Sequence, residues 1–196
     1  RLRAGELEPW LGPVKFKPEV NFSTDSVGLV HGLAWTSVGG EVLDVECSVV
    51  PGSGKLELTG NLGDVMKESC QAAVTYIRSR TSELGIDPAF HKNTDIHLHF
   101  PEGAVPKDGP SAGAAICLCV VSALTNRPVC ADIAMTGEIT LRGRVLPIGG
   151  IQEKTMAALR AGIHEVLLPE DNVSDLAEMD PNVRNAVNFT AVSHME

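Results

Sequence analysis

Apolar and polar positions along the chain follow two periods, one typical of strands and the other of helices. Val38-Gly39-Gly40 separates two runs of β-favouring residues, a pattern that predicts a β-hairpin. The glycines at 52 and 54 predict a turn into a further short strand. The strand-like runs of the first half lie at 27–35, 41–50, 55–58 and 95–100.

Helical spacing occurs in three segments. Between Asp64 and Leu84 apolar residues recur at steps of three, four or seven, which predicts an amphipathic helix ended by Gly85. Residues 111–124 are small and apolar on every side, so we expect a central helix that is covered all round. Residues 151–161 predict a second amphipathic helix.

Short strands are predicted in the second half at 132–136, 139–146 and 165–168, with Arg142-Gly143 turning between the halves of the second. The N-terminal residues carry Pro9, Pro13 and Pro18, which interrupt any helix. Strands and helices mix throughout, so we expect an α/β (α+β) fold. The predicted organisation is a lead-in segment at 1–24 and one domain at 25–196.

Composition is typical of a globular domain, with 196 residues, 43% apolar and 21% charged. Sixteen Lys and Arg against 25 Asp and Glu leave a net charge of −9, which argues against nucleic acids and anionic membranes as partners. The longest uncharged stretch, 109–126, has too short an apolar part to span a bilayer, and the N-terminus does not resemble a secretory signal. Since the first residue is not Met, we expect a fragment or a processed chain.

The cysteines indicate a reducing compartment. There are five, an odd number without C-x-x-C spacing, so we expect free thiols in place of a disulfide framework. The bacterial cytoplasm is the expected location, with the mitochondrial matrix as the alternative. The cysteines are Cys47, Cys70, Cys117, Cys119 and Cys130.

A candidate nucleophile lies in the loop 106–113, which leads into the apolar helix. Pro110 at the first helical position would place Ser111 in the first turn, where backbone N–H groups lack intrahelical partners. These donors and the positive end of the helix suit an oxyanion, as acyl transfer requires. The small residues around Ser111 leave room for a substrate backbone. The alternative interpretation is a serine that only helps to cap the helix.

A candidate base lies in the helix 151–161, whose apolar face contains Ile151, Thr155 and Ala158. Lys154 follows Ile151 by three residues and precedes Ala158 by four, so it lies on the same face. Burial disfavours the charged ammonium and lowers its pKa, which suits a general base. A lysine that snorkels from a surface helix is the alternative. Together, Ser111 and Lys154 suggest a Ser-Lys dyad.

Three segments carry a family resemblance. PEGAVPKDGPSAG, AMTGEITLRGRVLPIGGIQEKT and, upstream, GLAWTSVGGE closely resemble the proteolytic domain of the ATP-dependent Lon proteases, in the family's order and spacing. The resemblance covers nearly the whole chain. It implies the Lon proteolytic-domain fold, similar to ribosomal protein S5 domain 2, and a serine endopeptidase that hydrolyses unfolded or damaged proteins. Ser111 then corresponds to the nucleophile and Lys154 to the general base.

The resemblance also implies supporting residues. Thr136 matches a residue near the lysine ammonium, and Asp108 matches an acidic residue beside the nucleophile that adopts active or occluding conformations. Trp35 matches an aromatic residue whose loop shapes the active state. From its position before the nucleophile loop, we expect the segment Phe100-Pro101-Glu102-Gly103 to pair with substrate backbone and help to form a pocket.

Partners and cofactors follow from the same resemblance. It implies a ring of six subunits around an enclosed chamber, with unfolded chains delivered by an ATPase module of the same polypeptide. That module has no counterpart here, because Gly52-Ser53-Gly54-Lys55-Leu56 lacks the first P-loop glycine and the Ser or Thr that binds Mg²⁺. We therefore expect no ATP, Mg²⁺ or other cofactor on this chain, and neither nucleic acid nor membrane as a partner.

Three alternatives stay open. Residues 109–113 also satisfy G-x-S-x-G, the nucleophile elbow of α/β-hydrolases, with His164 and His194 as the only later histidines. His97 and His99 lie on one face of a strand, a spacing that can bind a metal, with His91 as the nearest third ligand. The third alternative is a ring-forming scaffold without catalysis, which predicts that one member of the dyad is lost.

Overall fold

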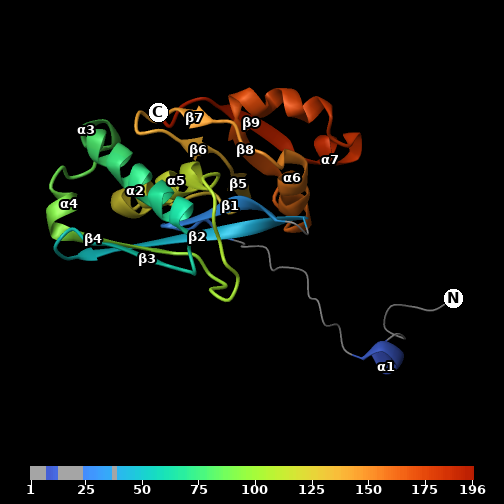
Figure 1. The fold of residues 1–196 in the computed structure, drawn as a ribbon, viewed down its shortest axis with the longest axis horizontal. Helices are drawn as coiled ribbons and strands as arrows, with labels where there is room; N and C mark the ends of the chain where they lie inside the picture. Colours follow the sequence, from blue (N-terminus) through green and yellow to red (C-terminus); the bar gives the residue numbers. More distant parts are fainter. Residues whose placement is uncertain (1–7, 13–23, 37–38) are drawn as a thin grey trace.

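Most strands of the computed structural model form one mixed sheet. The structure describes residues 8–12, 24–36 and 39–196. Within these residues the sheet has seven strands in the order β3-β4-β2-β1-β5-β8-β9 (Figure 1). They are β1 (Leu29–Thr36), β2 (Gly39–Pro51), β3 (Leu56–Thr59), β4 (Thr94–His99), β5 (Ile133–Met135), β8 (Glu165–Pro169) and β9 (Asn188–Val192).

The pairing of the strands places several chain segments at one edge of the sheet. β1 and β2 form the predicted antiparallel hairpin, with His31 opposite Asp44, although Val38 of the turn lies outside the described residues. β1 runs parallel to β5, and β5 runs parallel to β8. Because parallel strands end at the same edge, Thr36 at the end of β1 and Thr136 directly after β5 both lie at this carboxyl edge.

The helices follow the predicted order, and none in the described ranges is long and apolar enough to cross a bilayer. A small separate hairpin is formed by β6 (Glu138–Ile139) and β7 (Val145–Leu146). The helices are α1 (Glu8–Leu11), α2 (Asp64–Ser79), α3 (Thr81–Leu84), α4 (Phe90–Asn93), α5 (Gly113–Thr125), α6 (Ile151–Arg160), the 3₁₀ helix η2 (Glu170–Ala177) and α7 (Pro181–Ala186).

The sheet is covered on both faces, because successive residues of β1 point in opposite directions. Val30 and Ala34 pack into the core that contains α2 and α5, whereas Leu33 packs with Ala158 of α6. α5 contacts α2 on one side and both β1 and β2 on the other, and residues from Gly113 to Ala123 are almost all buried. The prediction of a central helix is therefore confirmed, but it is not covered on every side, because Leu118, Val121 and Leu124 are partly exposed.

Three predictions about the helices are wrong. α5 begins at Gly113 and not at Pro110, because the Gly113 N–H bonds to the Pro110 carbonyl and closes a turn before the helix. Ser111 therefore precedes the helix. The predicted helix 64–84 is divided at Arg80 into α2 and α3, although Gly85 ends it in the left-handed conformation as expected. A helical turn, α1, forms in the lead-in segment despite Pro9, since proline is tolerated in a first turn.

The hairpin and α6 lie in close contact at Gly40. A Cβ atom on Gly40 would lie 2.0 Å from the carbonyl oxygen of Glu153, and the Arg160 guanidinium donates a hydrogen bond of 2.6 Å to the Gly40 carbonyl. Backbone thus packs directly on backbone here. This contact determines how closely α6 lies against the hairpin.

Gly40→Ala should lower the free energy of unfolding by about 2–3 kcal/mol, because the added methyl group forces α6 away from β2. Urea unfolding of the 196-residue chain, followed by circular dichroism, measures this loss. Gly103→Ala is the matched control, since a Cβ atom there meets nothing within 4 Å. Equal losses at the two positions would contradict the contact.

Candidate active site

Ser111 lies in the turn between the loop 101–110 and α5, where it is partly exposed. Its carbonyl oxygen accepts hydrogen bonds from the Gly137 N–H at 2.8 Å and from Thr136 Oγ1 at 3.3 Å. The Gly137 carbonyl in turn accepts from the Ala114 N–H at 2.9 Å. The turn that carries Ser111 is therefore fastened to the residues that follow β5. Gly137 was missed from the sequence, although it is the neighbour of Thr136.

Lys154 lies in the first turn of α6 and is 2% exposed, which confirms the predicted inward orientation over a snorkelling one. Its Nζ donates a hydrogen bond of 3.0 Å to Thr136 Oγ1. No ion pair with Lys154 is recorded within the described ranges. Burial lowers the pKa of Lys154 from its ordinary value of 10.5 to about 8, because the charged form loses its hydration.

Thr136 connects the two candidate residues. Its hydroxyl accepts from Lys154 Nζ and donates to the Ser111 carbonyl, so hydrogen bonds run from α6 through the end of β5 to the turn before α5. In the described part of the chain, Ser111 Oγ has no recorded hydrogen bond to Lys154 Nζ. The structure therefore brings Ser111, Thr136 and Lys154 together at the carboxyl edge of the parallel strands, with Thr136 between the other two.

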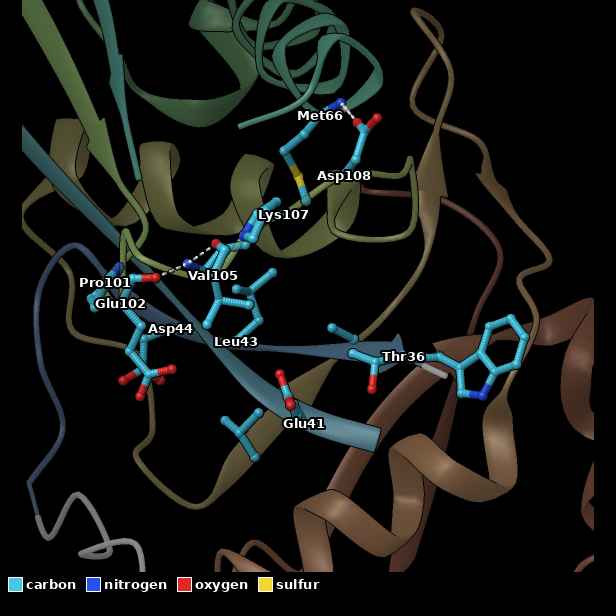
Figure 2. A pocket seen from close by; sticks show the side chains of 14 residues that line it. Thr36, Glu41, Leu43, Asp44, Met66, Pro101, Glu102, Val105, Lys107 and Asp108 are labelled. Atoms are coloured by element: carbon cyan, nitrogen blue, oxygen red, sulfur yellow. Dashed lines mark hydrogen bonds between the residues drawn. The ribbon is translucent and has the colours of Figure 1, made fainter. Parts of the chain in front are cut away.

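A pocket of about 140 Å³ lies between the β1–β2 hairpin and the loop 101–108 (Figure 2). Four predicted site residues line it, namely Trp35, Pro101, Glu102 and Asp108. Phe100 does not line the pocket, because its side chain is completely buried in the main core, and Gly103 also lies outside the lining. Within the segment 100–103, Phe100 thus packs in the core, whereas Pro101 and Glu102 line the pocket.

The pocket wall formed by the loop 101–108 is held by its own hydrogen bonds. Glu102 adopts the left-handed conformation with φ 63°, and its carbonyl accepts from the Val105 N–H at 3.0 Å. The ammonium of Lys107 donates to the carbonyls of Glu102 at 2.8 Å and Val105 at 3.2 Å. Figure 2 shows this loop on the side of the pocket opposite the strands.

The Asp108 carboxylate points toward the start of α2. Its Oδ1 accepts hydrogen bonds from the N–H of Met66 at 3.0 Å (Figure 2) and of Gly109 at 2.9 Å. It therefore caps α2, whose own N-cap residue, Gly63, has no side chain to do so. Gly63 is required at this point, because a Cβ atom there would lie 2.3 Å from Asp108 Cγ.

Trp35 is 61% exposed and covers the start of α6. A Cβ atom on Gly150 would lie 2.8 Å from Trp35 Cγ, and Gly150 adopts the left-handed conformation with φ 72° directly before α6. The indole therefore connects the pocket, which it lines, to the helix that carries Lys154.

Several pocket residues were not predicted from the sequence, among them Met66, Leu43 and Glu41. Met66 was assigned only to the apolar face of its helix, and it both packs in the core and borders the pocket. No local pattern marks these residues, because the loop 101–108 comes to lie over them only in the folded chain.

The predicted metal alternative has no ligand set in the structure. His97 Nε2 and His99 Nδ1 both bond to the hydroxyl of Thr59, at 2.8 and 2.7 Å. His91 Nδ1 donates a hydrogen bond of 2.8 Å to the Pro88 carbonyl. Among the described residues no group of three or more His, Cys, Asp or Glu side chains is arranged to bind a metal ion.

The nucleophile-elbow geometry is also missing from the described residues. A loop and not a strand leads into Ser111, since β4 already ends at His99. His164 bonds to the Ala186 carbonyl, and His194 packs its ring edge against Tyr76. Neither histidine has a recorded contact with Ser111.

Comparison with known proteins agrees with this geometry. The family model for the Lon protease (S16) C-terminal proteolytic domain matches residues 1–196. The chain is 56% identical over 193 residues to a Lon protease of Brevibacillus choshinensis, covering 98% of the chain and 25% of that protein. It is 55% identical over 195 residues to the Lon protease of Heliobacterium modesticaldum, a match that covers 100% of the chain and 24% of that protein. It is 54% identical over 195 residues to the Lon protease of Clostridioides difficile, which covers 100% of the chain and 25% of that protein.

The chain thus spans about a quarter of the length of these curated relatives. The matched region contains the three motifs. Hydrogen bonds join Ser111, Thr136 and Lys154 of two of them, whereas Trp35 and Asp108 line the neighbouring pocket, whose lining includes none of those three residues. The chain belongs to the family of Lon protease C-terminal proteolytic domains.

Proposed function

We propose that this chain is the catalytic domain of a serine endopeptidase, with Ser111 as the nucleophile and Lys154 as the general base. One observation carries the proposal: the ammonium of Lys154 is buried, bonds to Thr136 and has no counter-ion among the residues that the structure describes. A lysine with a pKa of about 8 is neutral in a useful fraction near physiological pH. Thr136 holds its Nζ beside the turn that carries Ser111.

The reaction follows from these positions. Neutral Lys154 takes the proton of the Ser111 hydroxyl, whose oxygen attacks a peptide carbonyl, and the protonated lysine then supplies a proton to the leaving amine. Within the described residues no acceptor is recorded for the backbone N–H groups of Asp108 and Ser111, which supports their use as oxyanion donors. Lys154 next activates a water molecule that hydrolyses the acyl-enzyme.

The pocket supports an extended polypeptide as the substrate. Its walls are a strand hairpin and a loop, between which an extended chain could lie. In this proposal residues 25–196 form the proteolytic unit, and unfolded or damaged proteins reach it from an ATPase module of the same, longer polypeptide in a ring of six. The chain itself uses no ATP. A scaffold without catalysis is less well supported, since Ser111 and Lys154 are both present and connected through Thr136.

Replacement of either dyad member should abolish peptide hydrolysis. We expect Ser111→Ala and Lys154→Ala to lower kcat about 1,000-fold or more, because each removes an atom that reacts or moves a proton. The measurement is cleavage of a fluorogenic peptide by the full-length protein that contains this chain. Lys92→Ala, an exposed lysine, is the control and should retain activity, as should His194→Ala. Activity in Lys154→Ala together with its loss in His194→Ala would restore the hydrolase-elbow alternative.

The pH profile should report the lysine. Because Lys154 acts as a base with a pKa of about 8, kcat/KM should rise about tenfold per pH unit below pH 8 and level off above it. Steady-state kinetics of the full-length protein from pH 6 to 9.5 tests this. A flat profile over this range would rule out Lys154 as the base.

Lys154→Met should stabilise the domain at neutral pH by about 3 kcal/mol, because the folded chain lowers the pKa of Lys154 from 10.5 to about 8. Below pH 8 the unfolded chain binds the proton more favourably, so the parent bears the full destabilisation there. As pH rises from 8 to 10.5 the parent gains stability, and the advantage of the variant shrinks. Urea unfolding at pH 7 and 10 measures the difference, with Lys92→Met as the control. An advantage independent of pH would contradict the titration.

A further inference from the structure

Asn172 is a buried amide that the proposed mechanism does not use. It lies in η2 and is 4% exposed, one of the few polar side chains buried in the described part of the chain. Its Oδ1 accepts from the Ile148 N–H at 2.9 Å, and its Nδ2 donates to the Ile148 carbonyl at 2.9 Å and to Asp175 Oδ2 at 2.7 Å. One side chain thus satisfies both backbone groups of Ile148, as a neighbouring strand would.

Ile148 lies shortly before the start of the helix that carries Lys154. Only Gly149 and Gly150 separate it from α6, and α6 has no side-chain cap of its own. The Lys154 N–H makes the first helical hydrogen bond, at 2.9 Å, to the Gly150 carbonyl. The position of the first turn of α6 therefore depends on the backbone of residues 148–150, in which two glycines add freedom.

Apolar packing joins the same two elements. Ile151 at the start of α6 packs with Leu168 of β8 and Met179 after η2, and Ile148 and Leu176 border this cluster. Packing of this kind is compatible with small shifts along the helix axis, whereas the two hydrogen bonds to Ile148 define one position. Asn172 therefore supplies the directional part of the contact.

We infer that Asn172 is a positioning residue for Lys154, because its carboxamide fixes the backbone that begins α6 and so keeps the lysine Nζ dry and within reach of Thr136. This inference rests on the proposed function of Lys154 as the base. Asn172 itself touches neither Ser111 nor Thr136 in any recorded contact, and it acts through the helix.

The proposal predicts a change in the titration of Lys154. Other charged groups around α6 could also affect the pKa of this lysine. The elements packed against α6 are β1, β2, η2 and α7. His31 and Asp44 pair with each other at 2.7 Å, and Asp171 pairs with Arg144 at 3.4 Å, so these groups have partners other than Lys154. The titratable and charged groups on these four elements are His31, Glu41, Asp44, Glu46, Cys47, Glu170, Asp171, Asp175 and Arg184, and α6 itself adds Glu153 and Arg160.

The test compares pH profiles of the full-length protein with Asn172→Ala. Loss of the two hydrogen bonds between Asn172 and the backbone of Ile148 admits water to the first turn of α6, and this hydration returns the pKa of Lys154 toward its ordinary value. We expect kcat to fall about tenfold at pH 7 and to recover above pH 9, with the rising limb displaced to higher pH and KM changed less than twofold. Asn182→Ala, an exposed asparagine of α7 whose side chain makes no recorded hydrogen bond, is the matched control and should keep the parent profile.

A purely structural role for Asn172 predicts another result. It would lower the unfolding temperature or scale kcat equally at every pH while leaving the limb in place, and that outcome would overturn the inference. If Asn172→Ala does not fold, Asn172→Ser, which adds no charge and cannot make both bonds to Ile148, is judged by the same displacement. Activity that persists in Lys154→Ala would instead refute the proposed base, whereas inactive Lys154→Ala with an unmoved Asn172→Ala profile refutes the positioning role alone.

Discussion

The burial of one ammonium group at the carboxyl edge of a sheet is the constraint on which the site depends. Water would bind the charge of Lys154 far better than the interior does, and the recorded partner of its Nζ is a neutral hydroxyl, that of Thr136. The fold tolerates this cost because the alternative, neutral form is accessible near physiological pH. The burial of Lys154 thus lowers the stability of the fold, and it does so at the residue that we propose as the base. Perturbed pKa values of this kind are common in active sites.

The arrangement of strands explains how three distant segments meet at this amine. β5 lies between β1 and β8 and parallel to both, so its end, with Thr136 directly after it, lies within the sheet edge and not at its margin. α5 lies on one face of the sheet and α6 on the other. Thr136 is therefore placed where it can bond to Lys154 of α6 and to the turn before α5.

The loop before Ser111 is positioned by contacts with α2 and not by the helix it leads into. Asp108 caps α2 from a distance of 42 residues in sequence, and the Lys107 carbonyl accepts a hydrogen bond of 2.8 Å from the Gly63 N–H. These bonds satisfy polar groups that α2 would otherwise leave unpaired at its start. They also hold the loop over the hairpin, which creates the pocket beside Thr36 at the carboxyl edge of the parallel strands.

The sequence by itself determined most of the elements and the inward orientation of Lys154, because both depend on local spacing. Helical periodicity placed Lys154 on the inward face, alternation predicted the β1–β2 hairpin, and the apolar run around Ile116 predicted the buried helix. The division of the helix at Arg80 and the late start of α5 were not predicted, since hydrogen bonds of single backbone groups decide them. Only the tertiary structure decided that Asp108 caps α2, that Met66 borders the pocket and that Asn172 holds Ile148. Each of these contacts joins residues far apart in the chain, and no local pattern encodes a partner that folding alone brings near.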